Sequence, residues 1–139
     1  MDDALRRNML AQAAAEPYAQ KLALRVTELE SGHAVVEMPC TAAMDNIFGM
    51  THGGAIFSLM DEAFQLACNS HGTVAVALNV SVTYYAPPAK GTVLRAEAVE
   101  QHRSRRTGSY LITVTDNTDK KIAACQALAY RTGKPLSFS

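Results

Sequence analysis

The sequence predicts an α+β fold in which a β-sheet wraps around a single long helix. Three observations carry this prediction. Only one long stretch with helical periodicity lies in the middle of the chain, a strand hairpin precedes it, and four consecutive strand-like runs follow it. The 139 residues suit one folded unit, so we expect a single domain over residues 1–139.

A short helix is expected first, within residues 1–16. The run 4–15 is rich in good helix formers, and Pro17 is expected to end it. Its apolar positions share one face, as in a helix that lies on a surface. These positions are Leu5, Met9 and Ala13.

A hairpin is expected next. The strand-like runs 22–29 and 33–39 flank Glu30-Ser31-Gly32, which is a short polar turn signal. Residues 41–51 have no clear period and are read as an irregular connection. The hairpin therefore leads through a loop into the central helix.

The central helix is predicted over residues 53–71, with Gly72 as its stop. Its apolar arc is wide enough for burial on most of its circumference. The arc comprises Ile56, Phe57, Leu59, Met60, Ala63, Phe64 and Ala67. The other side comprises Ser58, Glu62, Gln65 and Asn69.

From Thr73 the period changes to two, and this strand is expected to end before Pro87-Pro88. Three further strand-like runs cover 92–100, 109–116 and 121–130. Polar or arginine-rich segments separate them, as hairpin loops should. The last run presents a face of small side chains that lets a helix approach closely. This face consists of Ala123, Cys125, Ala127 and Ala129.

Composition excludes several classes of protein. With 13 basic and 13 acidic residues the formal charge is zero, which removes any global argument for nucleic-acid binding. No apolar run approaches the roughly 20 residues of a membrane span, and no signal peptide is expected. Three widely spaced cysteines, Cys40, Cys68 and Cys125, favour a reducing compartment and a cytoplasmic protein.

Asp61 is the residue of the central helix that breaks the local pattern. It lies too far from the helix start to act as a cap, and at the edge of the apolar arc. A carboxylate there is either an ordinary polar neighbour of Gln65, or a base or nucleophile whose pKa is raised by partial burial. Periodicity leaves both readings open.

Thr51-His52-Gly53-Gly54 precedes the helix directly. First-turn amides lack intrahelical partners, and glycine lets a ligand atom approach them closely, which suits a carbonyl oxygen that becomes an oxyanion. The alternative is that two glycines merely form the turn into the helix.

The spacing of these two features suggests a dimer. Gly53 and Asp61 are eight residues apart, roughly 12 Å along one helix axis, which is too far for both to act on one carbonyl. If both take part in one reaction, Asp61 should come from a neighbouring chain. The spacing therefore predicts an isologous dimer with shared sites.

Other candidate residues have weaker signals. Asn46 and Gly49 lie in the loop before the helix, where Asn46 either holds the loop or aims its amide at a water or carbonyl. A solvated hairpin tip is favoured over phosphate binding for Arg103, Arg105 and Arg106. Cys68 is read as packing rather than as a nucleophile. The histidines His33, His52, His71 and His102 lack metal-ligand spacing, so no metal site is expected.

Taken together, these residues resemble the hotdog-fold acyl-CoA thioesterases, in the PaaI-like branch of phenylacetic acid degradation. The resemblance covers about residues 20–132. Its motif is N-x-x-G-x-x-H-G-G-x-x-x-x-x-x-D from Asn46 to Asp61, followed by V-T-Y-Y-A-P from Val82 and T-G-S-Y from Thr107. It implies an antiparallel sheet around one central helix.

The resemblance also implies roles for single residues. Asp61 would act as nucleophile or general base, and the Gly53 N–H would polarise the thioester carbonyl. Asn46 would orient water or the carbonyl, and His52 would support the loop and the thioester. Substrate contacts would come from Gly54, Phe57, Phe64 and the three arginines, with Met50, Met60 and Cys68 along the acyl tunnel.

The same resemblance implies an acyl-CoA substrate with an aryl-acetyl or a short to medium acyl group, no metal or redox cofactor, and homodimers that pair into tetramers. Some relatives have a Ser or Thr that helps to hold the attacking water, where this chain has Ala77. That departure leaves a non-catalytic CoA-ester-binding protein as one alternative. A hotdog enoyl-CoA hydratase or dehydratase is the other, although the acid and His pair that it needs is not found.

Overall fold

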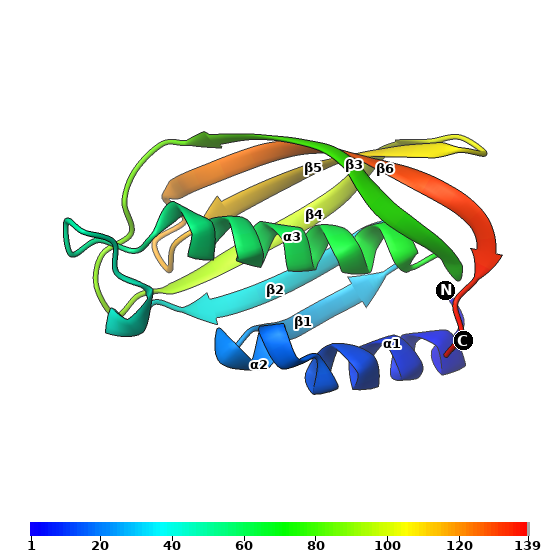
Figure 1. The fold of residues 1–139 in the computed structure, drawn as a ribbon, viewed down its shortest axis with the longest axis horizontal. Helices are drawn as coiled ribbons and strands as arrows, with labels where there is room; N and C mark the ends of the chain where they lie inside the picture. Colours follow the sequence, from blue (N-terminus) through cyan, green and yellow to red (C-terminus); the bar gives the residue numbers. More distant parts are fainter. Residues whose placement is uncertain (139) are drawn as a thin grey trace.

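The computed structural model describes residues 1–138 and contains helices, strands and one short 3-10 turn (Figure 1). The helices are α1 (Asp3–Ala15), α2 (Pro17–Lys21) and α3 (Gly53–Asn69), and the 3-10 turn is η1 (Ala42–Met44). The strands are β1 (Arg25–Glu30), β2 (His33–Pro39), β3 (Thr73–Tyr84), β4 (Val93–Arg103), β5 (Thr107–Thr115) and β6 (Lys121–Pro135).

The six strands form one antiparallel sheet in the order β1-β2-β4-β5-β6-β3. Helix α3 runs across the inner face of this curved sheet, and α1 and α2 lie beside the edge strand β1, which α1 contacts (Figure 1). This is the architecture that the sequence predicts: a hairpin, one long helix and four further strands. It is a hotdog fold.

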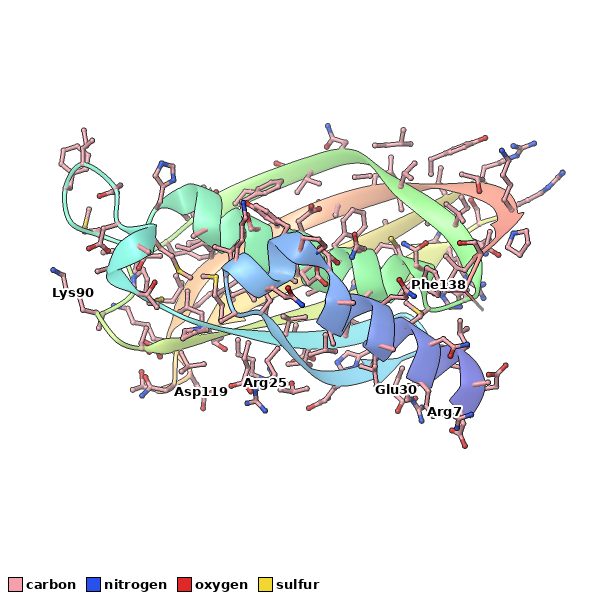
Figure 2. All side chains as sticks on the ribbon, turned by 60° about the horizontal axis from the view of Figure 1, so that its bottom comes forward. Arg7, Arg25, Glu30, Lys90, Asp119 and Phe138 are labelled. Atoms are coloured by element: carbon pink, nitrogen blue, oxygen red, sulfur yellow. The ribbon has the colours of Figure 1, made fainter. Side chains whose placement is uncertain are left out.

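The core lies between α3 and the sheet. Leu59, Ala63 and Ala67 are fully buried on α3, and Ile112 and Val114 are fully buried on β5. The Phe64 ring packs on Tyr110, with ring centroids 5.5 Å apart and a tilt of 59°. The small face of β6 is buried as predicted, while charged side chains such as Arg7, Arg25 and Lys90 point outward (Figure 2).

Several boundaries differ from the predicted ones, including the end of β6, which lies at Pro135 instead of residue 130. Pro17 ends α1 but also begins α2, because proline suits the first helical position, where no N–H is needed. Helix α3 ends at Asn69 instead of residue 71, with Ser70 as its cap and Gly72 at a φ of +80°. Strand β4 extends through Arg103, so the arginine-rich turn is reduced to residues 104–106.

Two residues on the predicted polar side of α3 are buried. Glu62 is only 6% exposed and Asn69 only 9%. The reason is tertiary: α1, the Glu16 junction and the C-terminal residues lie alongside this part of the helix. Within residues 1–138, no helix is both long and apolar enough to span a bilayer.

Candidate active site at the start of the central helix

The loop before α3 is held together by Asn46. Its Oδ1 accepts from the backbone N–H groups of Phe48, at 2.9 Å, and Met50, at 3.1 Å. Its own N–H donates to the Met50 carbonyl at 2.7 Å. Asn46 therefore has the loop-holding role, and its side-chain NH₂ group has no hydrogen-bond partner among residues 1–138.

His52 caps the helix. Its Nδ1 accepts from the Gly54 N–H at 2.9 Å, and its carbonyl accepts from the Ala55 N–H at 3.0 Å. This occupies the Gly54 N–H, which was predicted as a substrate contact. The Gly53 N–H is left without a partner among the described residues, at the positive end of the α3 dipole.

Tyr84 closes one side of Gly53. Its hydroxyl donates to the Gly53 carbonyl at 3.0 Å, and burial raises its pKa, so it remains a neutral donor. Both residues line a groove of about 250 Å³ that also includes Ile56 and Tyr85. Alternation along the strand places Tyr84 in β3, but no sequence signal indicates that it folds over the helix start.

Asp61 lies two turns further along α3, as its spacing from Gly53 predicts. The residue is exposed in the single chain. Partial burial of its carboxyl, and then the nearby Glu16 carboxylate, raise its pKa. One chain therefore presents an open amide at the helix start and a carboxyl of raised proton affinity roughly 12 Å away.

Comparison with known proteins identifies the family. The model of the Thioesterase superfamily matches residues 48–123, which include both Gly53 and Asp61. The chain belongs to this family. It is also 35% identical over 119 residues to the acyl-coenzyme A thioesterase PaaI of Escherichia coli, a match that covers 86% of this chain and 85% of that protein.

Solved structures of PaaI-like proteins are also similar to this chain. The E. coli PaaI protein from the phenylacetic acid degradation operon has a TM-score of 0.91 and 33% identity, with 96% of each chain covered. The Streptococcus mutans protein smu.793, solved with acetyl CoA bound, has a TM-score of 0.78 and 29% identity, covering 81% of this chain and 91% of that one. The chain is a PaaI-like hotdog thioesterase, a thioester hydrolase.

Several predicted contact residues of this thioesterase lie in the core of the single chain. Met60 is 1% exposed, Phe64 2% and Cys68 3%. Their side chains have no surface free for a ligand, and burial raises the pKa of Cys68 to about 12, which fits its packing role. Phe57 and Met50 are more accessible.

Two of the three arginines in and beside the β4–β5 turn contact polar groups of the same chain. The Arg103 Nε lies 3.6 Å from Glu100 Oε1, and Arg106 donates to the Tyr130 hydroxyl at 3.0 Å. The side chain of Arg105 is exposed and has no polar partner among residues 1–138. The turn is thus a hairpin tip with one unengaged guanidinium group.

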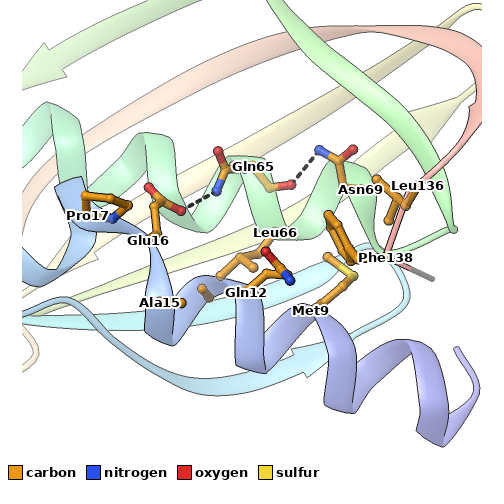
Figure 3. Close-up of a pocket in the computed structure, with 11 residues that line it drawn as sticks. Met9, Gln12, Ala15, Glu16, Pro17, Gln65, Leu66, Asn69, Leu136 and Phe138 are labelled. Atoms are coloured by element: carbon orange, nitrogen blue, oxygen red, sulfur yellow. Dashed lines mark hydrogen bonds between the residues drawn. The ribbon is translucent and has the colours of Figure 1, made fainter.

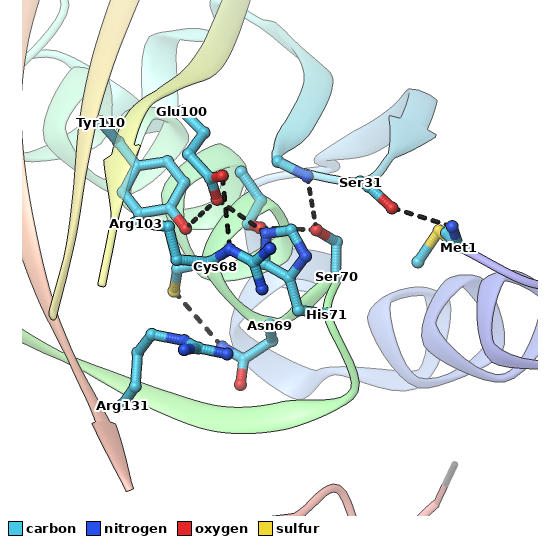
Figure 4. A network of polar contacts seen from close by, with 12 residues as sticks. Met1, Ser31, Cys68, Asn69, Ser70, His71, Glu100, Arg103, Tyr110 and Arg131 are labelled. Atoms are coloured by element: carbon cyan, nitrogen blue, oxygen red, sulfur yellow. Dashed lines mark hydrogen bonds and ion pairs between the residues drawn. The ribbon is translucent and has the colours of Figure 1, made fainter. Parts of the chain in front are cut away.

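A polar network that sequence reasoning missed lies at the opposite end of α3 (Figure 4). Glu100 accepts from the Tyr110 hydroxyl at 2.8 Å and contacts His71 Nε2 at 2.7 Å. Burial raises the pKa of Glu100, but these hydrogen bonds outweigh it and lower the pKa overall. The network is about 25 Å from Gly53, the length of the helix, and it joins the turn after α3 to β4 and β5.

A cavity of about 410 Å³ lies between α1 and α3 (Figure 3). Apolar walls come from Met9, Leu66 and Phe138, and polar groups from Glu16 and Gln65. It is separate from the groove at Gly53, since the two share no lining residue. Among residues 1–138 no group of three or more metal-ligating side chains gathers in either place.

Proposed function

We propose that this thioesterase hydrolyses acyl-CoA thioesters at a site shared by two chains. The observation that carries the proposal is that the Gly53 N–H, at the start of α3 and beside a groove, has no hydrogen-bond partner among residues 1–138. An amide in that position donates to an oxygen whose negative charge grows during acyl transfer, and the helix dipole adds to the effect. The names of the relatives support CoA esters as the substrates.

Asp61 of the second chain would supply the chemistry. As a nucleophile, its carboxylate adds to the carbonyl carbon, the C–S bond breaks, and CoA leaves as a thiolate that takes a proton from solvent. Water then hydrolyses the mixed anhydride. As a general base, Asp61 would instead take a proton from water as the water oxygen adds to the same carbon. A burst of free thiol that precedes acid release would indicate the nucleophilic path.

Exposed apolar side chains support a dimer. Ile47 and Phe48 in the loop are 91% and 74% exposed, and Val76 and Leu78 on the edge strand β3 are 50% and 57% exposed. A long, exposed, apolar edge strand tends to pair with another chain. Pairing two copies through β3 and this loop would cover the apolar surface and bring a second α3 towards Gly53. Two such dimers would form the expected tetramer.

The remaining groups would bind the substrate. The Asn46 NH₂ group, which has no partner in the described part of the chain, would donate to the carbonyl or bind the water, because Ala77 has no hydroxyl for this role. His52 would keep the loop in place, and Phe57 and Met50 would contact the acyl group. Arg105, with Arg103 and Arg106, would attract the CoA phosphates. The three cysteines are free and buried, which suits a reducing compartment such as the cytoplasm.

Thiol release from a panel of acyl-CoA esters tests the proposal, with wild type compared with Asp61→Asn. We expect Asp61→Asn to lower kcat by at least about 100-fold while keeping the fold, because it keeps size and hydrogen bonding but removes the base or nucleophile. If no ester is hydrolysed in an Asp61-dependent way but CoA esters still bind, the protein is a binding protein. Gel filtration with light scattering tests the shared site: an active monomer would contradict it.

A further inference from the structure

Glu62 is a buried acid that the proposed reaction does not use. It follows Asp61 on α3, and its side chain is almost entirely inaccessible. Its Oε1 is the only buried side-chain oxygen or nitrogen among residues 1–138 without a hydrogen-bond partner. Its Oε2 receives only a long contact, 3.5 Å from Gln65 Nε2.

The groups around Glu62 are acidic. Glu16 reaches it from the junction of α1 and α2, and Asp61 acts on it from its own helix. The Gln65 Nε2 bridges the two glutamates, since it also donates to Glu16 Oε2 at 2.9 Å. No cation among the described residues forms an ion pair with Glu62.

A buried carboxylate without a cation is strongly disfavoured, and two adjacent carboxylates cannot hydrogen-bond to each other. A carboxylic acid can donate to a carboxylate, which satisfies both groups at once. We propose that Glu62 is a neutral acid that donates its proton in a hydrogen bond to Glu16 and thereby positions the α1–α2 junction against α3 beside Asp61.

Electrostatics supports this arrangement. Burial first, and then the adjacent carboxyl groups of Glu16 and Asp61, raise the pKa of Glu62 to about 8. When that proton is lost to solvent, the three carboxylates Glu16, Asp61 and Glu62 repel one another. The α1–α2 junction is then released from α3. Glu16, which lines the cavity between α1 and α3, moves with the junction.

Glu62 is thus a positioning residue, since it acts through Glu16. Its effect on turnover rests on the proposed role of Asp61, because an ionised Glu62 beside Asp61 raises the proton affinity of that carboxyl. The protonation of Glu62, and its stabilisation of residues 1–21 through Glu16, do not depend on any catalytic role. These can be tested in a protein that has no thioesterase activity.

The first test is a ¹³C NMR titration of the glutamate carboxyl groups. We expect one resonance with a midpoint near pH 8 that is missing in Glu62→Gln. Glu16→Gln should lower that midpoint by at least about one pH unit, because it removes the neighbouring charge. A Glu62 carboxyl that titrates below pH 6 would overturn the proposal.

The second test is hydrogen exchange of residues 3–21, corrected for the intrinsic effect of pH. In the wild type we expect protection to fall about tenfold or more between pH 6 and pH 9. Glu62→Gln keeps a neutral donor that cannot ionise, so it should stay protected at both values. Glu28→Gln, which changes an exposed acid on β1, should behave like wild type. The same loss of protection in Glu62→Gln would refute the mechanism.

The pH profile of kcat/KM separates this inference from the proposed function. If Asp61→Asn leaves turnover unchanged, the proposed function fails, while the NMR and exchange results still decide the state of Glu62. If turnover depends on Asp61, Glu62→Gln should lack the change that wild type shows near pH 8. Identical profiles for the two proteins would contradict a link between Glu62 and Asp61.

Discussion

Replacement of Gly53 by alanine separates folding from function at the helix start. The backbone of Gly53 is not in the left-handed region, so alanine is sterically allowed. Its new methyl carbon would lie 3.4 Å from Tyr84 Cζ, at the edge of ordinary van der Waals contact. Tyr84 and Gly53 both line the 250 Å³ groove, so the methyl group would occupy part of it.

The expected effects on stability and on activity differ in size. Alanine in a helix is favoured over glycine by about 0.5–1 kcal/mol, which offsets the close contact with Tyr84. The free energy of unfolding should therefore change by less than about 1 kcal/mol. An oxyanion must come within about 3 Å of the Gly53 N–H, and the alanine methyl group in the groove would keep it from that position. We therefore expect kcat to fall by about 10²–10³, the cost of losing one such donor.

Steady-state thiol release and thermal unfolding of the same preparation measure both quantities. Tyr84→Phe is the matched control, because it removes the hydrogen bond to the Gly53 carbonyl at 3.0 Å and leaves the groove open. We expect it to lower kcat/KM by only about fivefold, the effect of one neutral hydrogen bond. A Gly53→Ala protein that unfolds like wild type and keeps a third or more of the wild-type kcat would refute the assigned role of this amide.

Two further predictions concern stability. Asn69 donates to the carbonyls of Gln65 and Ala75 and accepts from the Ala75 N–H at 2.9 Å. Asn69→Ala should therefore lower the free energy of unfolding by about 3 kcal/mol and Tm by about 10 °C. Ser81 is exposed, so the control Ser81→Ala should change Tm little. Glu100 has a lowered pKa in the folded state, so its stabilisation is present above about pH 4.5 and is lost as the pH falls through the lower folded value. Glu100→Gln should therefore lower Tm more at pH 7 than at about pH 3, and an equal loss at both would contradict the assignment.

Much of the fold could be predicted because periodicity is local. The wide apolar arc from Ile56 to Ala67 defined a central helix buried by its surroundings, and the small face of β6 matched a closely packed strand. The proposed site was predictable in part for the same reason. The signal at Gly53 depends on the unpaired amides of any first helical turn, and its distance from Asp61 depends only on helix geometry.

The residues that were missed depend on contacts between distant segments. Glu62 has the helical position of a solvated side chain, and it is buried only because residue 16 folds back onto α3. Tyr84 contacts Gly53 across 31 positions of sequence. The His71–Glu100–Tyr110 network joins the turn after α3 to strands β4 and β5, and no single segment of the sequence predicts that these three parts meet.

The order of the elements, the central helix and the two residues on which the proposed chemistry depends could be predicted from the amino-acid sequence, because each follows from local periodicity or spacing. The folded chain was needed to identify the first-turn amide that stays free, since that depends on how His52 and Tyr84 pack around Gly53. It also decided which acid of the Asp61-Glu62 pair is buried. The physical reason is that burial and hydrogen-bond pairing are properties of the whole packed chain, whereas helix and strand periods are properties of a few consecutive residues.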